Sequence, residues 1–145
     1  MSPDTELRVR KPIRWRLALC GCAAGIVWTL LSAISTRLLG GAFNAAVPGN
    51  KLFSPSAGLA AFLLIANLAG GVWVMWLYSA IRPRYGAGPR TAALAGFAWW
   101  LASSLADATW GSFGLVPVSA LLPLSAVALP EMLVAAMVGS WLYKE

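Results

Sequence analysis

The sequence predicts an all-α membrane protein built as a bundle of four transmembrane helices. Hydrophobic residues make up 59% of its 145 residues, and only 11% are charged. An ordinary soluble domain has about a quarter of its residues charged. Four apolar stretches are each long enough to cross roughly 30 Å of hydrocarbon, which takes about 20 helical residues. Most charged residues fall outside these stretches, which is the pattern of a multi-pass membrane protein.

The first two predicted spans are almost free of charge. The first covers about 17–39, uncharged from Leu17 to Thr36, and the second covers about 57–80, in a region without charge between Lys51 and Arg82. Basic residues before the first span also suit a secretory signal peptide. We reject that alternative because the apolar run exceeds the roughly 7 to 15 residues of a signal peptide. Three further hydrophobic segments also follow it.

The third and fourth predicted spans each carry one acidic residue. The third covers about 91–115 and contains Asp107, and the fourth covers about 120–143 and contains Glu131. Glycines and a proline between them predict a turn. The domain organisation expected is therefore a basic cytoplasmic tail over 1–16 and a single four-helix transmembrane domain over 17–145.

Lysine and arginine are distributed unevenly between the two ends of the predicted spans. Nine lie on one side: Arg8, Arg10, Lys11, Arg14, Arg16, Arg82, Arg84, Arg90 and Lys144. The other side carries two, Arg37 and Lys51. Because cytoplasmic loops hold the excess of Lys and Arg, both termini are expected in the cytoplasm. The expected location is the bacterial cytoplasmic (inner) membrane.

The two halves of the chain show weak internal similarity. An offset of 71 aligns the first span with the third and gives five identities in 16 positions, Gly25 with Gly96 among them. An offset of 65 aligns the second span with the fourth and pairs Trp-Leu-Tyr at 76–78 with Trp-Leu-Tyr at 141–143. These matches predict a tandem duplication of a two-helix unit. The two copies would be related by a pseudo-two-fold axis along the membrane normal.

The residue types on which most metal and cofactor chemistry depends are scarce. There is no histidine, which excludes imidazole acid–base catalysis and His-ligated metals. Cys20 and Cys22 are two residues apart, so on a helix their thiols point about 200° away from each other and cannot share a ligand. The pattern Gly21-x-x-x-Gly25 in the same segment is typical of close helix packing. No metal site, no cofactor and no enzymatic activity are expected.

Three charged side chains fall within the predicted spans, where each should find a partner or face a cavity. Arg37 and Asp107 both lie near the outer ends of their helices, and an ion pair between them is one interpretation. Such a pair would either staple two helices together or form part of an ion pathway.

Glu131 lies about halfway along its span, directly after Pro130. Asn67 is at about the same depth in the second span, with Ser32, Ser103 and Ser104 on neighbouring helices. In one interpretation these residues form a polar site of a proton or cation carrier. In the other, Glu131 bonds to Asn67 or to a backbone carbonyl and only holds helices together.

The loop between the second and third spans is the most motif-like segment. Pro83 is expected to end the second helix, and Thr91 is expected to cap the third. The loop arginines Arg82, Arg84 and Arg90 beside a helix start could bind an anionic lipid phosphate, although positive-inside anchoring explains the same arginines without any ligand.

A resemblance rests on this loop and on the end of the chain. The segments concerned are Trp-Leu-Tyr at 76–78, Arg-Pro-Arg-Tyr-Gly-x-Gly-Pro-Arg-Thr-Ala at 82–92 and Gly-Ser-Trp-Leu-Tyr-Lys-Glu at 139–145. The pattern resembles small four-helix bacterial inner-membrane proteins described as hypothetical. The resemblance implies no activity and no site residues.

The sequence favours a small integral membrane protein with a structural, accessory or lipid-associated role. Its expected partners are anionic lipid headgroups on the cytoplasmic side and a membrane-protein partner or a second copy of itself, and no nucleic acid. The alternative is a small proton- or cation-coupled transporter or channel that uses Glu131 in the middle of the membrane. The two interpretations differ in whether Glu131 faces a cavity or is sealed among its neighbours.

Overall fold

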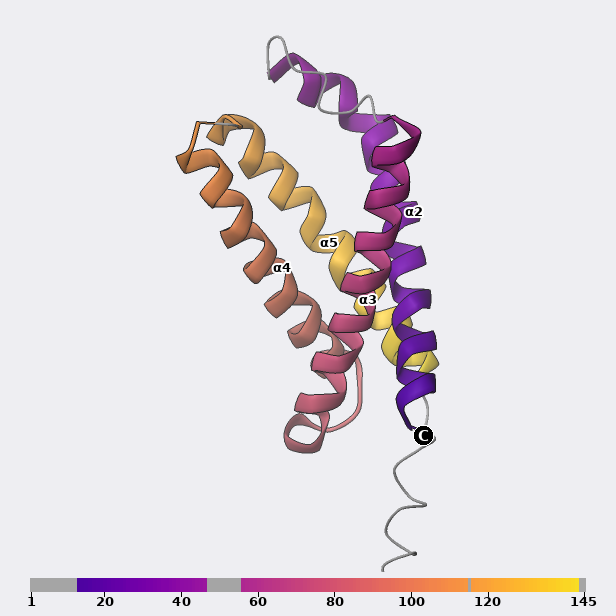
Figure 1. The fold of residues 1–145 in the computed structure, drawn as a ribbon. Coiled ribbons are helices and arrows are strands. Elements are labelled where there is room, and N and C mark those ends of the chain that lie inside the picture. Colours follow the sequence, from indigo (N-terminus) through magenta and orange to yellow (C-terminus); the bar gives the residue numbers. More distant parts are fainter. Residues whose placement is uncertain (1–12, 47–55, 115, 144–145) are drawn as a thin grey trace, which may run out of the picture.

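The computed structural model describes residues 13–46, 56–114 and 116–143, and these residues form four α-helices (Figure 1). The helices are α2 (Ile13–Ala46), α3 (Ala57–Tyr85), α4 (Pro89–Ser112) and α5 (Val118–Leu142). The all-helical prediction is confirmed, and each predicted span overlaps one helix. The first twelve residues of the basic tail, Lys51 and Lys144 lie outside the described residues.

Three of the described helices are long and apolar enough to cross a membrane: α2 over Trp15–Ala42, α3 and α5. This composition supports a membrane protein. Helix α4 has 24 residues but contains two adjacent tryptophans, several hydroxyl side chains and Asp107. These side chains lower the mean hydropathy of α4, so its composition alone does not mark it as a membrane-spanning helix.

The ends of α3 and α4 differ in detail from the sequence-based expectation. Pro83 does not end α3, which continues to Tyr85, because a proline in the last turn removes only one backbone hydrogen bond. Gly86 follows with φ 82°, a conformation that glycine adopts without strain. Thr91 is not a helix cap, because α4 already begins at Pro89. Its hydroxyl instead donates to the carbonyl of Gly86 at 2.8 Å and holds the loop against α4.

The helices form two antiparallel hairpins, α2–α3 and α4–α5. Helix α2 packs against α3 and α5, α4 packs against α5 and α3, and α2 and α4 do not touch. The hairpins converge at one end of the bundle and spread apart at the other (Figure 1). The start of α2 and the end of α5 lie together at the converged end, where Leu19 and Leu142 line one small pocket.

The hydrophobic core occupies the converged end. Its buried members are mostly small or flexible: Ala24, Val74, Met75, Tyr78, Ala92, Ala95, Met132, Ala136 and Tyr143. Glycine permits the close approach of α2 and α3, because Gly21 packs directly on Val72 and Gly71 packs directly on the backbone of Gly21. This contact agrees with the helix-packing role expected for the Gly21-x-x-x-Gly25 pattern. Above the core the hairpins diverge, and the space between them contains the polar residues.

Candidate functional site

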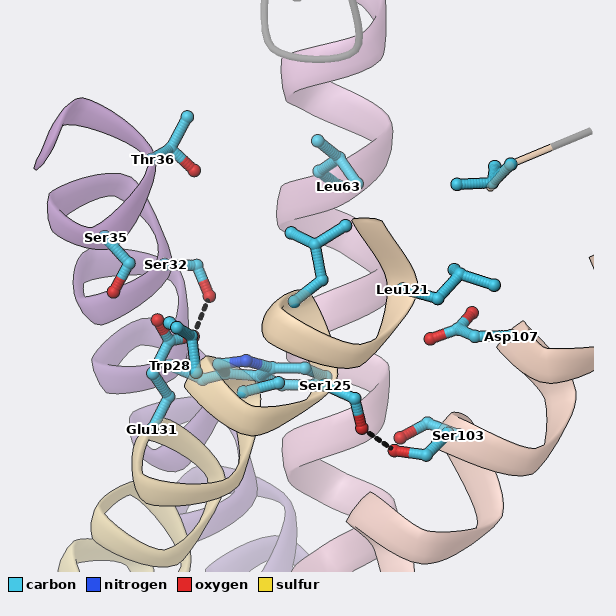
Figure 2. Close-up of a pocket in the computed structure, with 15 residues that line it drawn as sticks. Trp28, Ser32, Ser35, Thr36, Leu63, Ser103, Asp107, Leu121, Ser125 and Glu131 are labelled. Carbon is cyan, nitrogen blue, oxygen red and sulfur yellow. Dashed lines mark hydrogen bonds between the residues drawn. The ribbon is translucent and has the colours of Figure 1, made fainter. Parts of the chain in front are cut away.

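A partly enclosed cavity of about 420 Å³ lies between the two hairpins (Figure 2). Residues from all four described helices and from the α4–α5 turn line it: Trp28, Ser32, Ser35, Thr36, Leu63, Ser103, Ser104, Asp107, Val116, Leu121, Leu124, Ser125, Val127, Ala128 and Glu131. Two carboxyl groups and six hydroxyl groups belong to this set. Among the described residues, no lysine or arginine lines it, so the cavity has acidic groups set in mostly apolar walls.

The order of the residues along each helix defines an inner and an outer end of the cavity. Trp28 on α2, Ser103 on α4 and Glu131 on α5 are the lining residues nearest to the core. Thr36 and Asp107 lie on later turns of α2 and α4, toward the end where the hairpins spread. The cavity is therefore closed by the core at one end, with Glu131 deep and Asp107 near the mouth.

Glu131 is buried, with 8% of its surface exposed. Its Oε2 accepts a hydrogen bond of 2.7 Å from the hydroxyl of Ser32 (Figure 2). Glu131 follows Pro130 on α5, and its neighbour Met132 is buried in the core. The bond to Ser32 crosses from α5 to α2 and therefore links the two hairpins at the depth of the cavity.

The α4–α5 wall is held by hydrogen bonds between hydroxyl and indole groups. The hydroxyls of Ser104 and Ser125 lie 2.6 Å apart, and Trp100 Nε1 donates to the carbonyl of Ser125 at 2.8 Å. The hydroxyl of Ser103 donates to the carbonyl of Trp100 at 2.9 Å. These bonds pair polar groups that could not form hydrogen bonds with lipid. The two bonds that involve Ser125 also link α4 to α5.

Trp28 lies at the inner end of the cavity. It is half-buried, and its indole extends from α2 to Gly70 of α3. The ring fits there because Gly70 has no side chain: a Cβ on Gly70 would lie 2.8 Å from the Trp28 ring and 3.5 Å from Trp99. The inner end of the cavity is thus lined by an aromatic residue and by a buried carboxyl group.

Asn67 does not belong to the cavity. Its Nδ2 donates to the hydroxyl of Thr29 at 3.2 Å, and that hydroxyl donates to the carbonyl of Gly25 at 2.8 Å. The expectation that Asn67 joins Glu131 is therefore wrong, because the close approach at Gly25 directs the amide of Asn67 onto α2. Ser32 contacts the carboxyl group instead.

Arg37 and Asp107 do not form the ion pair considered from the sequence. Both are exposed, and no salt bridge joins them within the described part of the chain. The reason is the arrangement of the bundle, in which α2 and α4 do not touch. Asp107 lines the cavity whereas Arg37 does not.

The three loop arginines lie at the converged end. The guanidinium of Arg82 stacks over the ring of Tyr143 at 5.7 Å from its centroid, and Arg84 and Arg90 are exposed. A hollow of about 650 Å³ beside them is lined by Tyr78, Arg82, Ala87, Gly88, Pro89, Met137, Ser140, Trp141 and Tyr143. The structure thus places these arginines near one another and far along the helices from the Glu131 cavity.

The structure places Ser32, Ser103 and Ser104, which the sequence predicts in one polar site with Glu131, in the lining of the cavity. Sequence reasoning missed Ser35, Thr36, Ser125 and Trp28 as lining residues. Ser35 and Thr36 follow Ser32 at the helical spacing of three and four residues that puts side chains on one face. A search for hydroxyl groups at this spacing in an apolar helix would have found that face. No comparable pattern marks Ser125 or Trp28, because their roles depend on which helices become neighbours.

Metal chemistry finds no support among the described side chains. No group of three or more Asp, Glu, Cys or His residues comes together within 13–46, 56–114 and 116–143. Comparisons with protein-family models, with curated proteins and with solved structures find no match.

Proposed function

We propose that this chain is a small proton- or cation-coupled transporter that uses Glu131 inside the membrane. One observation carries the proposal: the buried carboxyl group of Glu131 lines a cavity with serine and threonine hydroxyls instead of being sealed among apolar side chains. An ionisable group at this depth costs about 2.5 kcal/mol or more unless a partner or a cavity compensates for it. A binding site for a cation gives such a group a function that offsets this cost.

The proposal includes a four-span topology. Helix α4 runs beside α5 over most of its length, and 24 residues extend about 36 Å at 1.5 Å per residue. It also connects the end of α3 to the turn that begins α5, and both of those helices are long enough to span. Both α3 and α5 run antiparallel to α4. If α3 and α5 each span the bilayer, α4 must therefore cross it between them.

We also propose that both termini face the cytoplasm of a bacterial cell. The start of α2, the end of α5 and the arginine-bearing α3–α4 loop lie at the same end of the bundle. Of the six arginines that the structure describes, five lie at that end and only Arg37 does not, in keeping with the positive-inside rule. The cavity would then open toward the outer side of the membrane.

The contacts of two glycines support a tandem duplication. A Cβ on Gly25 would meet the carbonyl oxygen of Asn67 and the Cα of Leu68. A Cβ on Gly96 would meet the carbonyl oxygen of Met132 and the Cα of Leu133. Offsets of 71 for the first helix and 65 for the second convert one contact into the other. Each hairpin thus uses the same glycine contact, as expected for two copies of one unit.

A purely structural role is the competing function. Glu131 bonded to Ser32 would hold α2 and α5 together without any ligand, and such bonds contribute about 0.6 kcal/mol on average in membranes. This role requires no cavity and no second carboxyl group near its mouth. The arrangement around Glu131 therefore favours the transport proposal.

The experiment is a flux assay with the purified full chain in liposomes. Glu131→Gln keeps an oxygen that can accept the Ser32 hydrogen bond but replaces the carboxyl group by an amide that cannot ionise. We expect proton or sodium flux in the wild type and at least a tenfold loss in this variant, with an unchanged elution profile in detergent. Ser112→Ala is the control, because Ser112 is exposed, donates only to the carbonyl of Thr109 and does not line the cavity. Equal flux in wild-type, Glu131→Gln and empty liposomes would support the structural role.

Association with anionic lipids is a secondary part of the proposal. Arg84 and Arg90 are exposed at the converged end, and a basic residue near a membrane surface contributes about 1 kcal/mol of attraction to anionic lipid. Binding of the chain to anionic nanodiscs rather than zwitterionic ones, reduced by Arg84→Gln together with Arg90→Gln, is the matching measurement.

A further inference from the structure

We infer that the cavity between the hairpins binds a small organic cation, with its positive group between Glu131 and Trp28 and its apolar body along the walls. This inference rests on the proposed function and specifies the chemical class of the ligand. It depends on three features of the cavity: the sign of its charge, the nature of its walls and its size.

The sign of the charge favours a cation. Glu131 and Asp107 line the cavity, and no lysine or arginine of 13–46, 56–114 or 116–143 does. Glu131 is nearly removed from solvent, and one hydroxyl bond from Ser32 satisfies only part of the four acceptor positions of a carboxylate. A bound cation would satisfy the others, whereas an anion would meet two carboxyl groups with no compensating charge.

The walls favour an organic cation over a bare metal ion. Leu63, Leu121, Leu124 and Val127 make up much of the lining, and these side chains offer no oxygen ligand. Ca²⁺ and Mg²⁺ require six or more oxygens at about 2.0 to 2.6 Å, gathered around one point. Here the hydroxyls are spread over α2, α4 and α5. Those of Ser104 and Ser125 are bonded to each other, and that of Ser103 donates to the carbonyl of Trp100. An ammonium group with an attached hydrocarbon matches polar and apolar surfaces at the same time.

Trp28 adds a feature that a sodium ion would not need. Trp28 and Glu131 both line the inner end of the cavity. A cation over an indole face is attracted by the negative face of the ring, by up to about 2 kcal/mol when water is excluded. An aromatic residue and a buried carboxyl group at one end of a cavity together suit a substituted ammonium ion.

The size of the cavity sets an upper limit on the ligand. A volume of about 420 Å³ is at the lower end of the range of about 300 to 1,000 Å³ that is usual for small-molecule sites. This volume holds a ring with an ammonium substituent and is much larger than a hydrated alkali ion requires. Benzyltrimethylammonium is a suitable probe because it combines one aromatic ring with a permanent charge.

Calorimetric titration of the full chain in detergent tests the inference. Benzyl alcohol keeps the ring without charge, and benzoate keeps the ring with the opposite charge. We expect benzyltrimethylammonium to bind at least about ten times more tightly than either of them. Equal affinity for benzyl alcohol would show that the cavity selects only apolar rings, and preferential binding of benzoate would show that it is an anion site. Either result would overturn the inference.

Two substitutions test the residues that hold the charge. Glu131→Gln should weaken benzyltrimethylammonium binding at least about tenfold, and Trp28→Leu about threefold to tenfold. Trp110→Leu is the matched control, because Trp110 is an exposed tryptophan of α4 that does not line the cavity, and it should change the affinity less than twofold. Unchanged binding in both Glu131→Gln and Trp28→Leu would refute the assigned position.

A measurement on the unaltered chain guards against a variant that fails to fold. A hydrophobic carbodiimide modifies buried carboxyl groups, and mass spectrometry of the peptide that contains Glu131 reports the extent. Benzyltrimethylammonium should slow this modification severalfold, and equal concentrations of benzyl alcohol should not. Modification at the same rate with and without the organic cation would count against the inference.

The outcome also separates this inference from the transport proposal. Glu131-dependent sodium or proton flux without benzyltrimethylammonium binding would retain the transporter and overturn the ligand class. Charge-selective binding of benzyltrimethylammonium without flux of any cation would retain the ligand class and overturn transport.

Discussion

Gly25→Ala should destabilise the chain through one steric conflict. The added Cβ would lie 2.6 Å from the carbonyl oxygen of Asn67 and 2.7 Å from the Cα of Leu68. Both are backbone atoms of α3, so no side chain can rotate away. An ordinary contact of about 3.4 Å or more requires the two helices to separate by nearly 1 Å, and such overpacking costs about 1 to 3 kcal/mol.

Two matched substitutions isolate this conflict from the general effect of replacing glycine by alanine. Gly41 also lies in α2, but a Cβ there would have nothing within 4 Å. Gly41→Ala should therefore be neutral or stabilising by up to about 1 kcal/mol, which is the gain in helix propensity. Gly96→Ala should fall between the two, because its nearest contacts are 3.0 Å and 3.2 Å.

The assay is unfolding of the purified chain by titration with a denaturing detergent, followed by tryptophan fluorescence. The expected order of unfolding free energies is Gly41→Ala highest, then Gly96→Ala, then Gly25→Ala, with about 1 to 4 kcal/mol between the extremes. If Gly25→Ala and Gly41→Ala have the same unfolding free energy, the reasoning about close contact between α2 and α3 is refuted.

The remaining predictions concern Asn67 and the orientation of the chain. Asn67→Ala should lower the unfolding free energy by about 0.5 to 1.5 kcal/mol, because it removes the bond to Thr29, and should leave liposome flux unchanged. A loss of flux without a loss of stability would instead place Asn67 in the transport route. For orientation, Ala87→Cys should react with an impermeant maleimide only from the cytoplasmic side and Ser112→Cys only from the outer side, in a chain whose two native cysteines are replaced by alanine. The reverse labelling pattern would contradict the proposed topology.

The helices could be predicted from the sequence because hydropathy and helix length both follow from the bilayer. The predicted span 17–39 lies inside α2, and 57–80 lies inside α3. The helices extend further than the apolar stretches because their ends are not limited to hydrocarbon. Residues up to Ala46 continue α2, and the turn that contains Pro83 continues α3. Hydropathy reports where lipid surrounds a helix and does not report where the helix ends.

The candidate site was predictable in part. The sequence predicts a polar site that joins Glu131 with Ser32, Ser103 and Ser104, and the structure places all four in the lining of the cavity. The bond of Glu131 to Ser32 rather than Asn67 depends on which faces of α2, α3 and α5 meet. The Gly21-x-x-x-Gly25 pattern predicts close packing of α2, but a single sequence does not identify α3 as the helix that it packs against.

The two prolines inside α5 affect the part of that helix that forms the cavity wall. Pro123 and Pro130 each lack a backbone N–H, so two rungs of the helical hydrogen-bond ladder are missing within eight residues. Leu124, Val127 and Ala128 lie between these prolines and line the cavity. The backbone of this segment is therefore the most easily bent part of α5. Bending of this segment would change the width of the cavity, so a ligand that enters it would contact a wall whose backbone lacks two of its hydrogen bonds.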